Sequence, residues 1–276
     1  MLFLCKQLKY NSNYNIIKDI FVGDIMGIII NNLNYKNIFK NLDLEINDKE
    51  FITIIGSSAS GKTTLVNFLS KKIESDNVTI DYKKEEISVV FDDIDSNFIY
   101  DTVIENLVFP LENLNYSKEE IDHKLNKIIE YLKIEELLNS NINTLSGGEK
   151  ELIVIASALI TEPKLLILDE PFIMLDNIQK EKIFKLLKKI NRELKTTIIY
   201  LTNDTESIIY GKTIGVITNK QITKGNLKDI LKNEKLFKNA KQKLPFMADL
   251  SLKLKYYDLI DDIILDESKM VDVLWK

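Results

Sequence analysis

The chain has 276 residues, of which 45% are hydrophobic and 29% charged, a composition typical of a globular protein. Its net charge of -5 excludes recruitment of nucleic acid by overall charge. A single cysteine, Cys5, excludes an internal disulfide framework, and a single histidine, His123, excludes a metal site built from two histidines. No apolar run approaches the roughly 18 residues that cross a bilayer, so we expect a cytosolic protein.

Residues 1–25 show weak periodicity and a polar centre, and the pattern changes at Met26. Two interpretations stay open for this segment. Either Met26 is the true initiator and residues 1–25 are an over-long reading frame, or they form a real and loosely ordered extension.

From Gly27 onward, strand-like and helix-like patterns alternate. Strands are expected where apolar residues alternate or run continuously, at 26–35, 42–46, 51–55, 87–91, 165–168, 197–202 and 213–218. Helices are expected directly after residue 63 and at 117–132, 146–160 and 178–194. From Gly225 the pattern is helical, apart from a break at Pro245. This order predicts an α/β fold with a mostly parallel sheet and helices on its faces.

A glycine-rich segment between the expected strand at 51–55 and the following helix fits the phosphate-binding pattern G-x-x-x-x-G-K-[ST]. Such a loop wraps phosphates with its backbone N–H groups, and the helix N-terminus adds partial positive charge. Lys62 is expected to reach the β- and γ-phosphates, and the Thr63 hydroxyl to bind Mg²⁺. The candidate nucleotide-binding residues here are Gly56, Ser57, Ser58, Ala59, Ser60, Gly61, Lys62, Thr63 and Thr64.

Two acids, Asp169 and Glu170, stand at the carboxyl end of the buried strand at 165–168. Ligands bind at this edge of such sheets. We expect Asp169 to hold Mg²⁺, directly or through water, and Glu170 to polarise the attacking water as general base.

A further motif, Leu145-Ser146-Gly147-Gly148-Glu149, resembles the signature motif of ABC-type ATPases. Ser146 lies 84 residues after Lys62 and 23 residues before Asp169, and both spacings match that family. As a local pattern, the motif is also a capping box that starts a helix. The resemblance implies that Ser146, Gly147 and Gly148 contact ATP held by an opposite subunit, that Asp176 belongs to the D-loop at the dimer interface, and that Tyr35 stacks on adenine.

The family resemblance also implies an architecture and domain limits. The core is expected to be a RecA-like sheet of the P-loop NTPase type, with an antiparallel β subdomain and a helical subdomain that carries the signature. The expected limits are an ATPase domain at 26–222, its helical subdomain at about 100–160, and a helical dimerisation extension at 223–276.

Two segments, Phe91 to Phe98 and Leu244 to Leu254, resemble the energy-coupling-factor (ECF) group of these ATPases, although the second is equally an amphipathic dimerisation helix. The resemblance implies a subunit on the cytoplasmic face of the membrane that powers uptake of a vitamin or a transition-metal ion. Its implied partners are a second ABC ATPase, a transmembrane T-type subunit and a substrate-binding membrane subunit.

The chain departs from the family at the two groups that sense the γ-phosphate. Asp92 stands where the family has the Q-loop glutamine; it keeps an oxygen that could approach the metal, but it is shorter and charged. Asn203 stands at the position of the switch histidine, where its neutral amide cannot exchange a proton near pH 7. His123 is expected on a distant helix and cannot substitute. Milder changes are Ser58, Ala59 and Glu149.

These features together predict that the chain binds Mg-ATP but that its own site, with Glu170, Asn203 and Asp92 as catalytic candidates, hydrolyses ATP slowly. Its signature would complete a competent site on a different ATPase, which favours a heterodimer. Two alternatives remain: an ATP-binding structural or regulatory subunit without significant hydrolysis, and a soluble ABC ATPase that is not tied to transport.

Overall fold

The computed structural model describes residues 27–172 and 175–275. The two interpretations of residues 1–25 therefore lie outside the described residues. Within the described residues, no helix combines the length and the apolar character needed to cross a bilayer.

The centre of the molecule is a six-stranded sheet with the order β5-β6-β7-β3-β8-β9. All neighbouring strands are parallel except β8 and β9, which pair antiparallel. The expected mostly parallel sheet is thus confirmed. Its strands are β3 (Phe51–Ile55), β5 (Ile87–Val90), β6 (Leu165–Asp169), β7 (Thr197–Thr202), β8 (Thr213–Thr218) and β9 (Gln221–Asn226).

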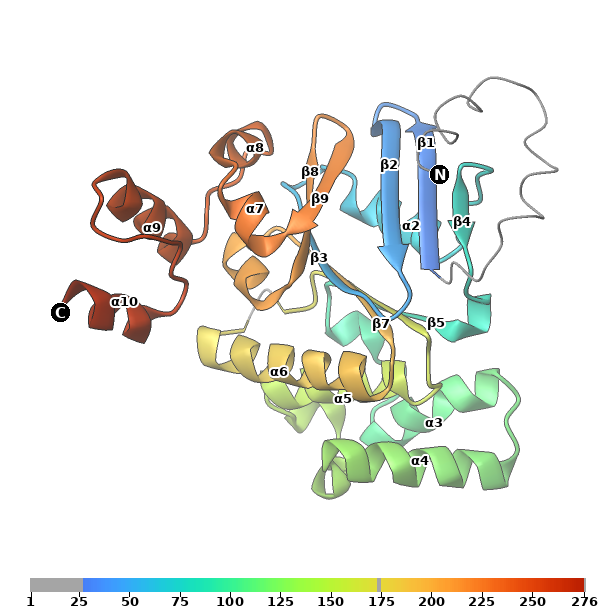
Figure 1. The fold of residues 1–276 in the computed structure, drawn as a ribbon. Coiled ribbons are helices and arrows are strands. Elements are labelled where there is room, and N and C mark those ends of the chain that lie inside the picture. Colours follow the sequence, from blue (N-terminus) through green and yellow to red (C-terminus); the bar gives the residue numbers. More distant parts are fainter. Residues whose placement is uncertain (1–26, 173–174, 276) are drawn as a thin grey trace, which may run out of the picture.

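A second, antiparallel sheet has the order β2-β1-β4 and confirms the expected β subdomain (Figure 1). In β2, buried and exposed residues alternate, as in a strand with one face on a core. That face packs on the helix that follows the glycine-rich loop, because Leu42 and Leu44 share a hydrophobic cluster with Leu65 and Phe68. The elements are β1 (Gly27–Tyr35), β2 (Phe39–Asn47), β4 (Val78–Ile80) and α2 (Lys62–Leu69).

Two helices cover the face of the central sheet that lies opposite α2. Two others pack beyond them and form a separate helical layer (Figure 1). Ser117 and Ser146 each form the predicted capping box, with Glu120 and Glu149 respectively. His123 is exposed, as expected, on a helix of this layer. The helices are α3 (Val103–Asn113), α4 (Lys118–Leu132), α5 (Gly147–Leu159) and α6 (Asn177–Glu193).

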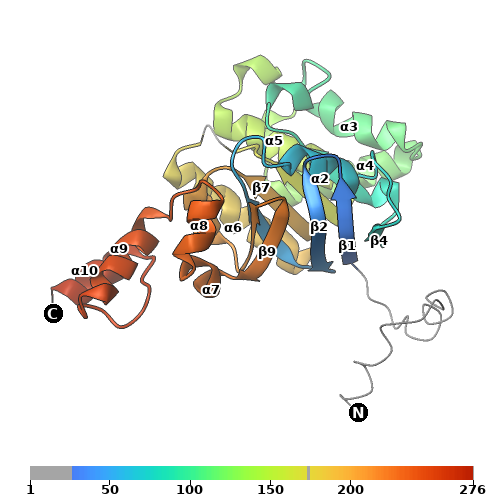
Figure 2. The same ribbon diagram turned by 90° about the horizontal axis from the view of Figure 1, so that it is seen from above.

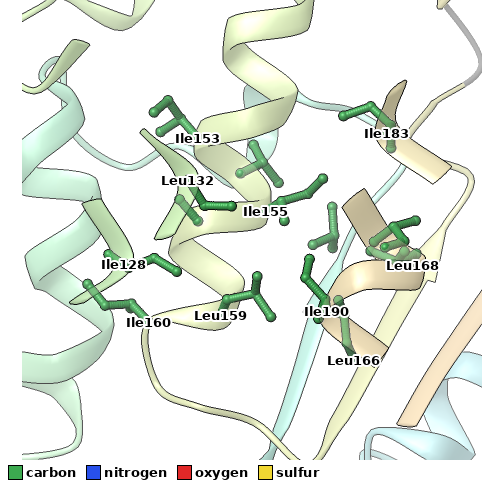
Figure 3. Packing of buried hydrophobic residues seen from close by; sticks show 14 of the residues in the cluster. Ile128, Leu132, Ile153, Ile155, Leu159, Ile160, Leu166, Leu168, Ile183 and Ile190 are labelled. Atoms are coloured by element: carbon green, nitrogen blue, oxygen red, sulfur yellow. The ribbon is translucent and has the colours of Figure 1, made fainter. Parts of the chain in front are cut away.

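Helix α5 joins the helical layer to the sheet. Its residues Ile155 and Leu159 pack between α4 on one side and strand β6 with helix α6 on the other (Figure 3). Each fully buried aliphatic side chain of this kind contributes about 1.5–3 kcal/mol to folding. The helical layer and the sheet therefore share one continuous core. Its members include Ile128, Leu132, Leu166, Leu168, Ile183 and Ile190, which Figure 3 labels.

The predicted boundary between residues 222 and 223 falls inside strand β9, so the central sheet extends to Asn226. The helical pattern expected from Gly225 was wrong at this end. Asn219 and Lys220 both have positive φ, which is the geometry of a type I′ hairpin turn, and they fold a polar edge strand back onto β8. Of the β9 side chains only Ile222 is buried, so the sequence carries little strand signal.

Four short helices follow β9, and Figure 2 shows that the last two project from one side of the sheet domain. Pro245 stands directly before the third, where its fixed φ suits a helix start. The helices are α7 (Leu227–Leu231), α8 (Glu234–Asn239), α9 (Phe246–Tyr256) and α10 (Glu267–Leu274).

Glu151 of α5 is buried, and its Oε2 makes no hydrogen bond to any described residue. Burial raises its pKa from 4.5 to about 8. Between these values the unfolded chain releases this proton while the folded chain keeps it, so this group makes the free energy of unfolding fall as pH rises from 4.5 to 8.

We therefore predict that Glu151→Gln increases stability at pH 8 and leaves it nearly unchanged at pH 4. Urea unfolding at both pH values measures the difference. Glu130→Gln, at an exposed position of α4, is the matched control and should leave the urea midpoint nearly unchanged at both pH values. An unchanged urea midpoint for Glu151→Gln at pH 8 would contradict the prediction.

Candidate nucleotide-binding site

The glycine-rich loop leaves the buried end of β3 and turns directly into α2. The Gly56 N–H donates to the Thr202 carbonyl of β7 over 3.2 Å, and the Ser60 N–H donates back to Ser57 over 3.0 Å. Two residues turn the chain through positive φ, Ala59 at 60° and Gly61 at 106°. For Ala59 this left-handed conformation costs about 1 kcal/mol. The contacts that hold the loop in its curved shape must offset this cost.

Lys62, the first residue of α2, lies at the centre of the candidate site and is buried. Its Nζ donates to the carbonyl oxygens of Gly56, over 2.7 Å, and Ser57, over 3.1 Å. The same Nζ lies 3.0 Å from Oε1 of Glu170. One ammonium group therefore joins the glycine-rich loop to the acidic edge of β6.

The two acids occupy the carboxyl end of β6, as predicted. The pKa of Asp169 is raised to about 6, mainly by burial and then by the negative charges of Glu170 and Asp92, while the Lys62 charge opposes the rise. Glu170 takes a positive φ of 57°, and its N–H donates to the Leu201 carbonyl of β7 over 2.9 Å. Three carboxylates thus share one edge of the sheet, where a cation would relieve their repulsion.

The residues present fit Mg²⁺ and a nucleotide. In residues 27–172 and 175–275, no group of three or more His, Cys, Asp or Glu side chains forms a metal site by itself. This suits Mg²⁺, which takes one or two carboxylates and completes its shell with phosphate oxygens and water. Thr63 and Thr64 lie at the N-terminus of α2 with their side chains at least partly exposed. The Ser60 hydroxyl is buried without a partner among the described residues, so the loop holds a free donor.

Asp92 follows β5 and is exposed at the start of a tightly turned segment. The Asn97 side chain holds this turn, because it accepts from the Phe91 N–H over 3.1 Å and donates to the Asp93 carbonyl over 2.8 Å. The effect of Asp92 on the pKa of Asp169 shows that its charge reaches the acidic edge. The supporting role of Asn97 was not predicted; its only signal was an amide six residues after the strand.

Asn203 follows β7 and is exposed, and its side chain makes no hydrogen bond within the part of the chain that the structure describes. The next residue, Asp204, accepts from Lys180 over 2.6 Å and from Ser207 over 2.7 Å. Burial opposes ionisation of Asp204, yet these two donors hold its pKa below its usual range. The backbone beside Asn203 is therefore anchored to α6, an anchor that the sequence analysis missed.

The signature residues lie apart from this cluster. Ser146 caps α5, and Gly147 and Ser146 are exposed. Asp176 caps α6 and is also exposed. Among the described residues, no hydrogen bond or ion pair joins Ser146 or Asp176 to Lys62 or Glu170. The structure thus places the capping residues of two helices on the surface.

Tyr35, the candidate adenine contact, lies at the end of β1 and is half-buried. Its ring meets that of Phe68 of α2 edge-on, with 5.0 Å between the centroids. Lys36 Nζ lies 5.1 Å from the centroid of the same Tyr35 ring. The ring is thereby held beside the helix that starts with Lys62.

Gly61 offers a direct test of the loop geometry. A Cβ at this position would lie 2.6 Å from Cγ2 of Ile38, and its φ of 106° strains any other residue. We predict that Gly61→Ala displaces the loop and weakens binding of a fluorescent ATP analogue by at least about tenfold, equal to about 1.4 kcal/mol.

The matched control is Gly147→Ala in the signature, because a Cβ there meets no atom within 4 Å. This variant should bind the analogue as the unaltered chain does. Equal affinities for the two variants would contradict the account of the loop.

Comparison with known proteins agrees with this geometry. The family model described as ABC transporter matches residues 39–173. The energy-coupling factor transporter ATP-binding protein EcfA1 of Mycoplasmopsis synoviae is 34% identical over 227 residues, which cover 76% of this chain and 84% of that relative. The solved structure of cbiO1 from Clostridium perfringens, part of the ABC transporter complex cbiONQ, has a TM-score of 0.71 at 26% identity and covers 82% of this chain and 99% of its own.

Some relatives are much longer than this chain. A putative ABC transporter ATP-binding protein of Bacillus cereus is 34% identical over 201 residues, which are 65% of this chain but only 36% of that relative. The chain thus spans about a third of the length of such relatives. The identity to EcfA1 and its coverage nevertheless establish the family. The chain belongs to the ATP-binding proteins of ABC transporters, and within them it is similar to the energy-coupling-factor and cobalt-type group.

Proposed function

We propose that the chain is the ATP-binding subunit of an ECF or cobalt-type importer, in which ATP binding and hydrolysis drive uptake of a vitamin or a transition-metal ion. The observation that carries the proposal is the separation of two half-sites. Lys62 and Glu170 form one half, and the exposed N-termini of α5 and α6 form the other. Each half needs its complement from a second ATPase subunit.

Lys62 and Glu170 are paired across 3.0 Å, and this pair suggests how nucleotide prepares the site. Phosphate oxygens attract the Lys62 ammonium more strongly than one carboxylate does, because they carry more charge. Lys62 then turns to the phosphates and leaves Glu170 free to accept a proton from the attacking water. Thr63, Asp169 and Asp92 would hold Mg²⁺, which offsets the phosphate charge when bound.

The two altered positions favour slow hydrolysis at this site. Asp92 brings a third negative charge to the acidic edge and is one cause of the raised pKa of Asp169. Asn203 can donate to a phosphate oxygen, but it stays neutral and cannot pass a proton. Binding groups are therefore kept while the groups that sense the γ-phosphate are weakened.

This imbalance favours a heterodimer in which the signature residues Ser146, Gly147 and Gly148 complete the site of a different ATPase, the first two of them exposed in this chain. Further proposed partners are a transmembrane T-type subunit and a substrate-binding membrane subunit, with this chain held peripherally on the cytoplasmic face of the membrane. The helical segment that follows β9 would support dimerisation, because it exposes Tyr256 of α9, Val271 of α10 and Trp275 directly after α10.

Two other functions use the same fold. Asp92 and Asn203 favour a structural or regulatory subunit that closes on ATP without hydrolysing it, whereas the retained Glu170 favours an enzyme. A soluble ABC ATPase with no tie to transport is the third candidate. Recovery of a polytopic membrane protein with the chain from solubilised membranes separates the first two functions from the third.

The proposal predicts that ATP hydrolysis is slow for the purified chain alone and rises when the paired ATPase is present. In the heterodimer, Glu170→Gln in this chain should leave most of the ATP hydrolysis intact, because the partner's site catalyses most of it. The corresponding substitution in the partner should abolish it. Full turnover by the lone chain, lost on its own Glu170→Gln, would overturn the proposal.

A companion variant tests the cause of the slow turnover. Asn203→His combined with Asp92→Gln should raise hydrolysis by the lone chain at least about tenfold, which is 1.4 kcal/mol of transition-state stabilisation. Asn239→His, at an exposed position of α8, is the matched control and should leave the rate unchanged. An unchanged rate in the double variant would favour the structural-subunit alternative.

A further inference from the structure

A cavity of about 520 Å³ lies between α4, the end of α5 and the end of α6. It is lined in part by Pro163 and Thr196, which stand just before β6 and β7. Asp169 ends β6 and Asn203 directly follows β7, both at the opposite edge of the sheet. The cavity is therefore separated from the nucleotide-binding cluster by the length of a strand, about 17–20 Å.

The floor of the cavity is apolar. Ile128, Leu159 and Ile160 line it and are almost fully buried, and Figure 3 shows them together where α4 meets the end of α5. Leu194 adds an exposed apolar side chain at the rim. A volume of this size with apolar walls lies within the range of small-molecule pockets, about 300–1,000 Å³.

The rim is positive, although the whole chain carries a net charge of -5. Four lysines line the cavity against two acids, Glu130 and Glu162. Lys124 forms an ion pair with Glu162, with 2.6 Å between Nζ and Oε2. Lys127 forms an ion pair with the other oxygen of the same carboxylate. Lys189 Nζ lies 3.9 Å from Oε2 of Glu193, one turn along α6. Lys133 makes no ion pair within the described part of the chain, so positive charge remains unneutralised here. The four are Lys124, Lys127, Lys133 and Lys189.

The cavity also lies at a joint between two parts of the molecule. Tyr131 of α4 reaches across to α6, where its hydroxyl donates to Glu193 over 3.2 Å. Lys189 of α6 lies over the Tyr131 ring, 4.3 Å from its centroid. These contacts connect the helical subdomain to the sheet domain, and a molecule in the cavity would touch both sides of the joint.

We propose that this cavity binds a small organic anion with an apolar body and that its occupancy sets how the helical subdomain rests against the sheet. The apolar body lies on the floor, and the anionic group lies between Lys133 and Lys189. Charge selects the occupant, because four lysines against two acids leave the lining net positive, which attracts an anion and repels a cation.

The test titrates the purified full chain with 8-anilinonaphthalene-1-sulfonate, an aromatic anion whose fluorescence rises on binding. N-phenyl-1-naphthylamine, which has the same rings without the sulfonate, is the neutral comparison. We expect the anion to bind at least about tenfold more tightly than the neutral probe. Lys133→Gln with Lys189→Gln should remove this preference, and Leu194→Ser should weaken both probes.

Two controls place the site. Lys185→Gln removes another exposed lysine of α6, and Tyr256→Ser removes an exposed aromatic ring of the C-terminal helices. Neither should change the affinity for the anion by more than about twofold. The cavity assignment is overturned if the double lysine variant binds the anion as the unaltered chain does, or if Tyr256→Ser abolishes binding. Urea unfolding of each variant confirms that it is folded.

The proposed effect of the bound anion on the contact between the helical subdomain and the sheet is tested by nucleotide affinity. Saturating anion should change the affinity for a fluorescent ATP analogue by at least about threefold, and the double lysine variant should lose this effect. Anion binding that leaves nucleotide affinity unchanged would overturn the effect on the joint. Because the probe titration needs neither hydrolysis nor transport, its outcome is independent of the proposed transport function.

Discussion

The contacts of the Lys62 ammonium are the constraint on which the rest of the site depends. One buried cation holds the carbonyls of Gly56 and Ser57 and also the carboxylate of Glu170. The loop after β3 and the acids after β6 are far apart in the sequence, with β7 between their strands in the sheet. Lys62 connects the loop to the acids. A lysine suits this position because its flexible side chain can move the ammonium from Glu170 to the phosphates of a bound nucleotide.

The acidic edge makes the site depend on that cation. Burial, followed by the negative charges of Glu170 and Asp92, raises the pKa of Asp169 to about 6. A neutral residue at position 92 would add no charge there. In the proposed function, the loop suits nucleotide binding, while the acidic edge and Asn203 suit slow hydrolysis. The exposed caps of α5 and α6 would let such a subunit complete the site of a partner.

Sequence predicted the parts of the fold that rest on strong local patterns. The buried run at Phe51–Ile55, the glycine-rich loop and the serine caps of α4 and α5 follow from periodicity and capping chemistry. Strand β9 was missed because its side chains are mostly exposed and its turn uses Asn219 and Lys220 without a glycine. Two contacts join segments that are distant in the sequence: the ion pair between Lys62 and Glu170, and the one between Lys180 and Asp204. No local sequence pattern predicts such contacts.

The central claim is that this chain binds Mg-ATP and leaves it largely intact. A single-turnover experiment, with the purified chain in excess over γ-³²P-labelled ATP and Mg²⁺ and quenched in acid, measures this directly. We predict that the label stays in protein-bound ATP for much longer than the turnover time of an ordinary enzyme, about 0.1 s. Release of labelled phosphate within about a second, prevented by Glu170→Gln, would contradict the claim.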